Sequence, residues 1–133
     1  MNESTLQAKL IQSLASLDAC PVENPKRAGT PDINFIGGWL EVKFLPRWPK
    51  RDSTVVKLNH FTPQQKVWLW RRCQKGGKAW LFLQVESTYL LFCGSRARMV
   101  GSLNKTQLIG HADAVWEVYP DKELITWLNP KNP

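Results

Sequence analysis

Apolar residues return every three or four positions at the start of the chain, which is the spacing of one face of a helix. The positions are Leu6, Leu10, Ile11, Leu14 and Leu17. They predict an amphipathic helix from about Asn2 to Leu17. Pro21 is expected to stop it, because proline lacks the backbone N–H that a helix interior needs.

A second helix has signals at both ends. Thr62 suits the position that caps the first turn, Pro63 suits the first helical position, and Gln65 stands where a capping box needs a glutamine. A Gly-Gly pair follows at 76–77, and glycine is favoured where a helix ends. We expect this helix to run from Thr62 to about residue 75.

Short apolar runs bounded by glycine or polar residues predict strands. Residues 33–36 and 39–45 are expected to form a hairpin that turns at Gly37 and Gly38. Further strands are expected over 22–24, 79–85, 89–92 and 115–119, and short helices over 95–101, 105–109 and 121–128. Residues 46–59, which include charges close to two prolines, predict a long exposed loop.

The order of helix, hairpin, helix and strands predicts an α/β fold in which helices flank a mixed central sheet. A chain of 133 residues has the length of one domain and is long enough to bury a core. We therefore expect a single domain over 1–133.

Positive charge is concentrated in the middle of the chain. The formal charge is +7, and residues 47–78 hold nine Lys and Arg against one acid, Asp52, for a local net charge of +8. The aromatic residues in or beside this stretch are Trp48, Phe61, Trp68, Trp70 and Trp80. Basic side chains neutralise phosphates and aromatic rings stack on bases. The pattern favours a nucleic acid as partner, with a solvated helix face as the alternative.

The composition argues against several other classes of protein. No apolar run approaches the roughly 20 residues of a membrane span, and the N-terminus lacks the pattern of a signal peptide. The three cysteines, Cys20, Cys73 and Cys93, are widely spaced and odd in number, which argues against a disulfide framework. We expect a soluble protein of the reducing cytoplasm, without a membrane partner.

Three charged residues are predicted to converge on the hairpin. Glu41 and Lys43 are two apart on one strand, so their side chains leave the same face. The turn would bring Asp32 back beside Glu41. Two adjacent carboxylates are costly unless a cation lies between them, and Mg²⁺ prefers such oxygen ligands. A divalent cation can activate water and neutralise phosphate charge. An ordinary Glu–Lys pair on a solvated strand is the alternative.

These residues belong to a longer ordered pattern: Pro31-Asp32, then Glu41-Val42-Lys43, then His60-Phe61-Thr62-Pro63-Gln64-Gln65. The first two motifs resemble the signature of the PD-(D/E)XK nuclease superfamily, and the third is similar to the VRR-NUC branch found in phage and repair nucleases. The similarity covers about residues 1–85, and 86–133 would complete the domain. The resemblance implies a restriction-endonuclease-like fold and hydrolysis of phosphodiesters to 5′-phosphate and 3′-hydroxyl ends.

The resemblance also assigns roles at the hairpin. Asp32, Glu41 and Val42 would hold Mg²⁺, for which Mn²⁺ is expected to substitute, and Lys43 would be the catalytic lysine.

Two further residues gain a role from the resemblance and have an ordinary alternative. A glutamate on the first helix completes the metal shell in many relatives; Glu3 fits that place and Glu23 is the rival. An acid in a first helical turn is also favoured by the helix dipole. Gln65 would point at the metal or the scissile phosphate, or it would only close the capping box. His60 is set outside the catalytic group because a histidine at a helix entry is usually structural.

The sequence as a whole predicts a Mg²⁺-dependent DNA endonuclease, selective for branched DNA such as Holliday junctions or flaps, and a homodimer by family analogy. The alternatives are a restriction-like or homing-type nuclease, an exonuclease, and a non-catalytic nucleic-acid-binding protein. The basic residues expected to contact DNA are Lys26, Arg27, Arg47, Lys50, Arg51, Lys57, Lys66, Arg71 and Arg72.

Overall fold

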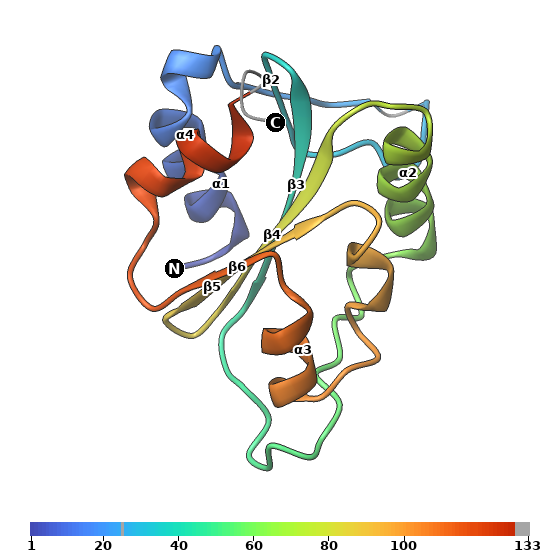
Figure 1. Ribbon diagram of the computed structural model, residues 1–133, viewed down its shortest axis with the longest axis vertical. Helices are drawn as coiled ribbons and strands as arrows, with labels where there is room; N and C mark the ends of the chain where they lie inside the picture. Colours follow the sequence, from blue (N-terminus) through green and yellow to red (C-terminus); the bar gives the residue numbers. More distant parts are fainter. Residues whose placement is uncertain (25, 130–133) are drawn as a thin grey trace.

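A six-stranded mixed sheet forms the centre of the molecule, with helices on both of its faces (Figure 1). The computed structural model describes residues 1–24 and 26–129. The strands are β1 (Cys20–Pro21), β2 (Ile33–Phe35), β3 (Gly38–Leu45), β4 (Ala79–Val85), β5 (Thr88–Cys93) and β6 (Ala114–Trp116). The helices are α1 (Glu3–Ser13), α2 (Pro63–Gln74), α3 (Lys105–His111) and α4 (Asp121–Leu128), with short 3₁₀ turns η1 (Ala15–Leu17) and η2 (Ala97–Met99).

The strands lie in the sheet in the order in which they follow along the chain. Neighbouring strands are antiparallel except β3 and β4, which are parallel and pair over seven positions from Trp39↔Ala79 to Leu45↔Val85. A parallel pair needs a crossover connection, and the segment that contains α2 supplies it. The expected α/β class with a mixed, helix-flanked sheet is confirmed.

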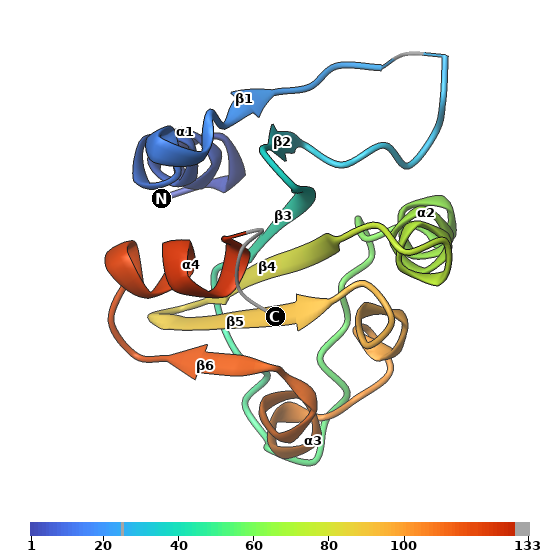
Figure 2. The same ribbon diagram turned by 45° about the horizontal axis from the view of Figure 1, so that its top comes forward.

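Two apolar cores lie on the two faces of the sheet. On one face, Leu6 and Leu10 of α1 and Leu14 directly after it pack with Leu124 and Leu128 of α4, and all five side chains are buried. On the other face, α2, η2 and α3 cover a second core that includes α2 residues Trp68 and Leu69. Figure 2 shows α1 and α4 on one side of the strands and α2 with α3 on the other. The sheet is therefore sealed on both faces, as α/β folds require.

The first helix is shorter than expected. It ends at Ser13 and a 3₁₀ turn replaces the last part of the predicted 2–17 span. Asn2 is not helical; its side chain caps the helix by accepting from the Thr5 N–H at 2.8 Å. By contrast, α2 has the predicted cap: Thr62 and Gln65 form a full capping box and Pro63 opens the helix.

The hairpin turn lies one residue earlier than expected. Ile36 and Gly37 form the turn, Gly37 has a φ of +93°, and Gly38 pairs with Phe35 as the first residue of β3. Gly38 is needed in the strand because a Cβ there would lie 2.8 Å from the Phe35 ring and 2.9 Å from the Lys78 carbonyl oxygen. The expectation of a Gly37-Gly38 turn was therefore wrong by one position.

Two other expectations need correction. The strand expected over 22–24 lies at Cys20–Pro21 instead, because its partners Asn34 and Ile33 set the register. The loop over 46–59 is not wholly exposed: Val56 and Leu58 are buried in the core under α2, and the Val56 N–H donates to the Leu103 carbonyl. The remaining strands and short helices lie within a few residues of their predicted positions.

Within the described part of the chain, no helix has the length and apolar character needed to cross a bilayer.

Candidate active site

The edge of β3 is uncovered beyond Leu40, where β2 stops pairing with it. Beyond that point Asp32 takes the place of a strand partner, since its Oδ2 accepts a hydrogen bond from the Val42 N–H at 2.8 Å. The same register, extended by one position, puts Asp32 opposite Glu41. The end of β2 therefore delivers one carboxylate to the middle of β3, as the hairpin spacing predicts.

Glu41 and Lys43 lie on the face of β3 that α2 covers, between Trp39 and Leu45, which are on the same face and pack against the core. Both are buried, with 1% and 4% of their surface exposed. Lys43 Nζ lies 3.1 Å from Glu41 Oε2, so the two form an ion pair. The expectation that Asp32, Glu41 and Lys43 converge matches the geometry. The alternative, an ordinary Glu–Lys pair on a solvated strand, does not, because the Glu41 and Lys43 side chains are buried.

The Glu41 carboxyl is held in an unfavourable environment. Burial raises its pKa to about 9; the nearby charge of Asp32 and contact with that carboxyl also raise it, while the Lys43 ammonium lowers it. Its Oε1 is buried and has no hydrogen-bond partner among the described residues. A buried acceptor without a partner costs on the order of 1–3 kcal/mol. The place where Asp32, Glu41 and Lys43 meet is called the corner below. In it, Glu41 Oε1 has no hydrogen-bond donor beside it among the described residues.

Gln65 reaches the corner from the first turn of α2. Its side chain Oε1 accepts from the Thr62 N–H at 2.9 Å, and its Nε2 lies 3.4 Å from Glu41 Oε2 as a long donor contact. The two roles weighed for Gln65 are therefore compatible. The capping box fixes the amide so that its NH₂ end faces the carboxylate.

Glu3 lies on the same free edge of β3 as Asp32, beside the Phe44 N–H, which is the next backbone donor along that edge. Its Oε1 accepts from the Phe44 N–H at 3.2 Å and is 2.9 Å from His60 Nε2. Glu3 and Asp32 therefore satisfy two backbone donors that a neighbouring strand would otherwise pair. The contact with His60 was not foreseen, because the two residues are 57 positions apart and no spacing links them.

The donor set at the corner fits a hard cation. The described residues contain no group of three or more His, Cys, Asp and Glu side chains close enough to hold a metal together. The corner instead offers two carboxylates, Asp32 and Glu41, and the carbonyl of Val42, which points to the same side of β3 as the Val42 N–H because a strand residue directs both groups to one side. One or two carboxylates with further oxygen donors suit Mg²⁺, which keeps several of its waters. Glu23 is exposed on the segment after β1.

The basic residues fall into two groups. Arg71 and Arg72 lie on α2, and Lys26 and Arg27 lie on the segment between β1 and β2, which Figure 2 shows reaching toward α2. The second group lies on the 46–62 segment, which passes beside α3 at the bottom of Figure 1; its members are Arg47, Lys50, Arg51 and Lys57, all exposed. Lys66 is half-buried, 5.4 Å from the Phe61 ring.

No protein-family model, curated protein or solved structure matches this chain. What the protein does is therefore inferred from its own side chains.

Proposed function

We propose that the protein is a Mg²⁺-dependent nuclease of the PD-(D/E)XK type that hydrolyses phosphodiester bonds in DNA. The observation that carries this proposal is the buried corner on β3, where Asp32, Glu41 and Lys43 meet and one Glu41 oxygen is left without a partner. The buried Glu41 and Lys43, with the half-buried Asp32 carboxylate beside them, cost stability. Their presence is explained if they hold a cation and act on a substrate.

Each residue has a distinct role in this proposal. Asp32, Glu41 and the Val42 carbonyl would hold the ion, which would supply an activated water and neutralise charge on the phosphate. Lys43, which donates to Glu41 Oε2, is positioned to offer its ammonium to the attacking water or to a phosphate oxygen. Gln65 orients the Glu41 carboxylate.

Glu3 is assigned a positioning role. Its Oε1 is already engaged by the Phe44 N–H and His60, so it fixes the edge of β3 next to the corner. A place for Glu3 in the metal shell stays a prediction, as does the rival role of Glu23.

The proposed substrate is duplex DNA with a branch, cut by an endonuclease. The two basic groups would contact the phosphate backbone, which positions a nucleic acid without reading its bases. Such contacts do not distinguish one base from another, so the shape of the DNA is the expected determinant. A homodimer would present two such corners at a fixed spacing, which suits a four-way junction. The restriction-endonuclease-like fold is part of this proposal.

The test uses plasmid, linear duplex, flap and four-way-junction DNA, each incubated with Mg²⁺, Mn²⁺ or EDTA. Cleavage restricted to branched DNA and dependent on the metal is expected. Asp32→Ala and Lys43→Ala should each reduce the rate by on the order of a thousandfold or more, while binding to DNA in Ca²⁺ is retained.

The matched control is Asp113→Ala. Asp113 is also a half-buried carboxylate that accepts a backbone N–H, that of Cys93 at 2.7 Å, but it lies outside the corner. Full activity in Asp32→Ala or Lys43→Ala would refute the catalytic assignment. Binding without cleavage would favour the non-catalytic binding protein, and shortening from the ends would favour an exonuclease.

A further inference from the structure

A basic pocket lies along one side of α2, at a distance from the corner on β3. Its volume is about 390 Å³, and it is lined by Arg27, Trp68, Arg71, Arg72, Lys75 and Gly77. Residues 68, 71, 72 and 75 follow the three- and four-residue spacing of one helix face. Arg27 comes from the segment between β1 and β2, so two separate parts of the chain build the pocket.

That segment is held against α2 by close backbone contact. Gly29 has a φ of +88°, and a Cβ there would lie only 2.5 Å from the Gln64 carbonyl oxygen. The Thr30 hydroxyl donates to the Arg27 carbonyl at 3.0 Å, which closes a turn. The position of Arg27 over α2 therefore follows from packing of the main chain.

Arg72 is preorganised for binding. It is half-buried, and its guanidinium lies 4.4 Å from the centre of the Trp68 ring and 5.4 Å from that of Trp39. An arginine that stacks on aromatic rings keeps its N–H edge available for hydrogen bonds in the ring plane. Little side-chain freedom then remains to be lost when an anion binds.

Among the described residues, no acid forms an ion pair with the positive charges in the pocket. The ion pairs among the described residues are Lys43–Glu41, His60–Glu3 and Arg96–Asp113. None of them involves the pocket's four cations, Arg27, Arg71, Arg72 and Lys75. Clustered like charges repel, so an anion that enters the pocket relieves this repulsion.

We propose that this pocket is a binding site for a phosphate group, separate from the phosphate that is cleaved. The fork of an arginine matches two phosphate oxygens, and two arginines and a lysine on adjacent helical turns can surround one tetrahedral anion. The site rests on the proposed function only for the source of its phosphate, which is the nucleic acid. Gln65, at the corner, and Arg72 are about two helical turns apart, or roughly 10 Å along α2. One nucleic-acid strand could therefore occupy both the corner and the basic pocket.

The phosphate can come from two sources: a terminal phosphomonoester or an internal phosphodiester. The first experiment avoids the question by titrating the full-length protein with inorganic pyrophosphate in EDTA, at constant ionic strength. The signals are tryptophan fluorescence, because two tryptophans flank Arg72, and the NMR resonance of the Arg72 side-chain N–H. Saturable binding is expected in the wild type, at least tenfold weaker in the variant Arg71→Ala/Arg72→Ala.

The matched control is Arg47→Ala/Arg51→Ala, which removes the same charge from the 46–62 segment. It should change the pyrophosphate affinity less than twofold. Arg72→Lys is the milder variant for the case in which the double variant does not fold. It keeps the positive charge but loses the stacked guanidinium, and it should still weaken pyrophosphate binding. Equal weakening by both double variants, or no binding beyond that of chloride, would overturn the proposal.

A charge-neutral variant tests the position of Arg72 itself. A Cβ on Gly77 would lie 2.7 Å from Arg72 Cδ, whereas a Cβ on Gly110 would meet nothing within 4 Å. Gly77→Ala should therefore weaken pyrophosphate binding severalfold and Gly110→Ala should not. Equal affinities in these two variants, each with the wild-type melting temperature, would count against the role of Arg72.

The source of the phosphate is read from short oligonucleotides with and without terminal phosphates, bound in EDTA. A fivefold or larger gain from a terminal phosphate, lost in Arg71→Ala/Arg72→Ala, identifies the monoester. Equal affinity for oligonucleotides with and without a terminal phosphate, weakened in Arg71→Ala/Arg72→Ala, identifies an internal phosphate. Affinity that does not respond to Arg71→Ala/Arg72→Ala contradicts the site. Because no metal is present, these results stand or fall separately from cleavage.

Discussion

The two faces of β3 carry buried side chains of different chemistry, apolar on one face and charged on the other. Toward α1 the strand presents Leu40 and Val42, both fully buried in an apolar core. Toward α2 the same strand presents Glu41 and Lys43, which are buried almost as deeply but are charged groups. The first face contributes stability, since each buried aliphatic side chain is worth about 1.5–3 kcal/mol. The second costs stability, and the proposed metal-dependent chemistry would explain why it is kept.

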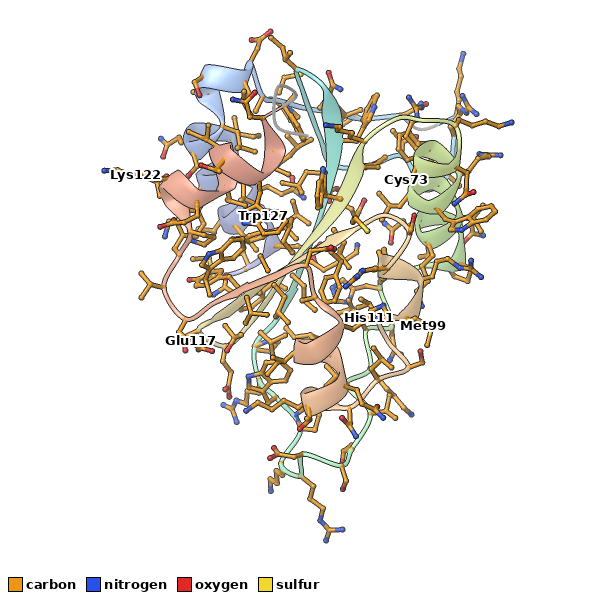
Figure 3. The ribbon with its side chains drawn as sticks, viewed as in Figure 1. Cys73, Met99, His111, Glu117, Lys122 and Trp127 are labelled. Carbon is orange, nitrogen blue, oxygen red and sulfur yellow. The ribbon has the colours of Figure 1, made fainter. Side chains whose placement is uncertain are left out.

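The same contrast separates the apolar core beneath α1 and α4 from the charged corner on β3. The apolar core beneath α1 and α4 consists mainly of buried leucines, and beside it the half-buried Trp80 meets Trp127 edge to face with ring centres 6.4 Å apart. Figure 3 shows Trp127 on α4 and Cys73 on α2, with β4 between the two helices. The corner, by contrast, consists of a carboxylate that caps a free strand edge and an acid without a partner. If the proposed function is correct, folding and catalysis depend on neighbouring residues of one strand, and substitutions should separate the two.

The sharpest separation compares Glu41→Gln with Val42→Ala. Glu41→Gln should lower cleavage by on the order of a thousandfold while the metal-free protein unfolds at the same or a higher urea concentration, because a buried ionisable group is removed. Val42→Ala should lower the free energy of unfolding by about 2 kcal/mol and leave the rate of cleavage within about twofold, since the Val42 carbonyl is kept. Urea denaturation and initial cleavage rates measure the two effects. The reverse pattern would mean that Glu41 is structural.

The second prediction concerns the pH dependence of stability without metal. The ordinary pKa of Glu41 is 4.5 and in the folded protein it is about 9. Between these values the folded state holds one more proton than the unfolded state, so the free energy of unfolding falls as pH rises. The slope should approach about 1.4 kcal/mol per pH unit. Urea titrations from pH 5 to 9 in EDTA should show this fall in the wild type relative to Glu41→Gln; parallel curves would show that the pKa is ordinary.

A smaller effect separates the two functions of Gln65. Gln65→Ala and Gln107→Ala each remove the glutamine of a capping box, the first in α2 and the second in α3. Each should lower the free energy of unfolding by about 1 kcal/mol. Only Gln65→Ala also removes the contact to Glu41, and it should slow cleavage about 10–100-fold. Equal cleavage rates in the two variants would leave Gln65 with a capping role alone.

The smallest expected effect is at Glu3. The side chains of Glu3 and His60 are 34% and 44% exposed, and ion pairs with this much solvent contact contribute about 0–1 kcal/mol. Glu3→Gln keeps an oxygen for the Phe44 N–H, so stability should change by less than about 1 kcal/mol and cleavage by a few-fold. A tenfold or greater loss of Mg²⁺ affinity in Glu3→Gln, with none in Glu23→Gln, would instead place Glu3 in the metal shell.

The sequence was most informative where local chemistry decides the structure. The cap of α2 follows from Thr62, Pro63 and Gln65 alone, because these residues satisfy the first backbone donors of their own helix. The spacing of Glu41 and Lys43 likewise fixes their shared face through the period of a strand. Both features depend on neighbours within a few residues.

Features that depend on distant packing were not predictable. The turn expected at Gly37-Gly38 lies one residue earlier, at Ile36-Gly37, because the Phe35 ring and the Lys78 carbonyl leave no room for a Cβ at position 38. The proximity of Asp32 to Glu41 was predicted from the sequence, but the exact register of the two strands was not. That the Asp32 side chain would replace a strand partner for the Val42 N–H also required the end of β2 to be known. The basic pocket is a third case, since Arg27 meets α2 only through the close contact at Gly29.

Titration of the protein with Mn²⁺ at pH 7.5, followed by electron paramagnetic resonance and by calorimetry in buffers of different ionisation enthalpy, tests whether the corner holds a cation. One bound ion per chain is expected, displaced by Mg²⁺, with release of about one proton as Glu41 ionises and with at least tenfold weaker binding in Asp32→Asn and Glu41→Gln. Absence of Mn²⁺ binding, or equal affinity in all three proteins, would contradict the assignment of Asp32 and Glu41 as metal ligands.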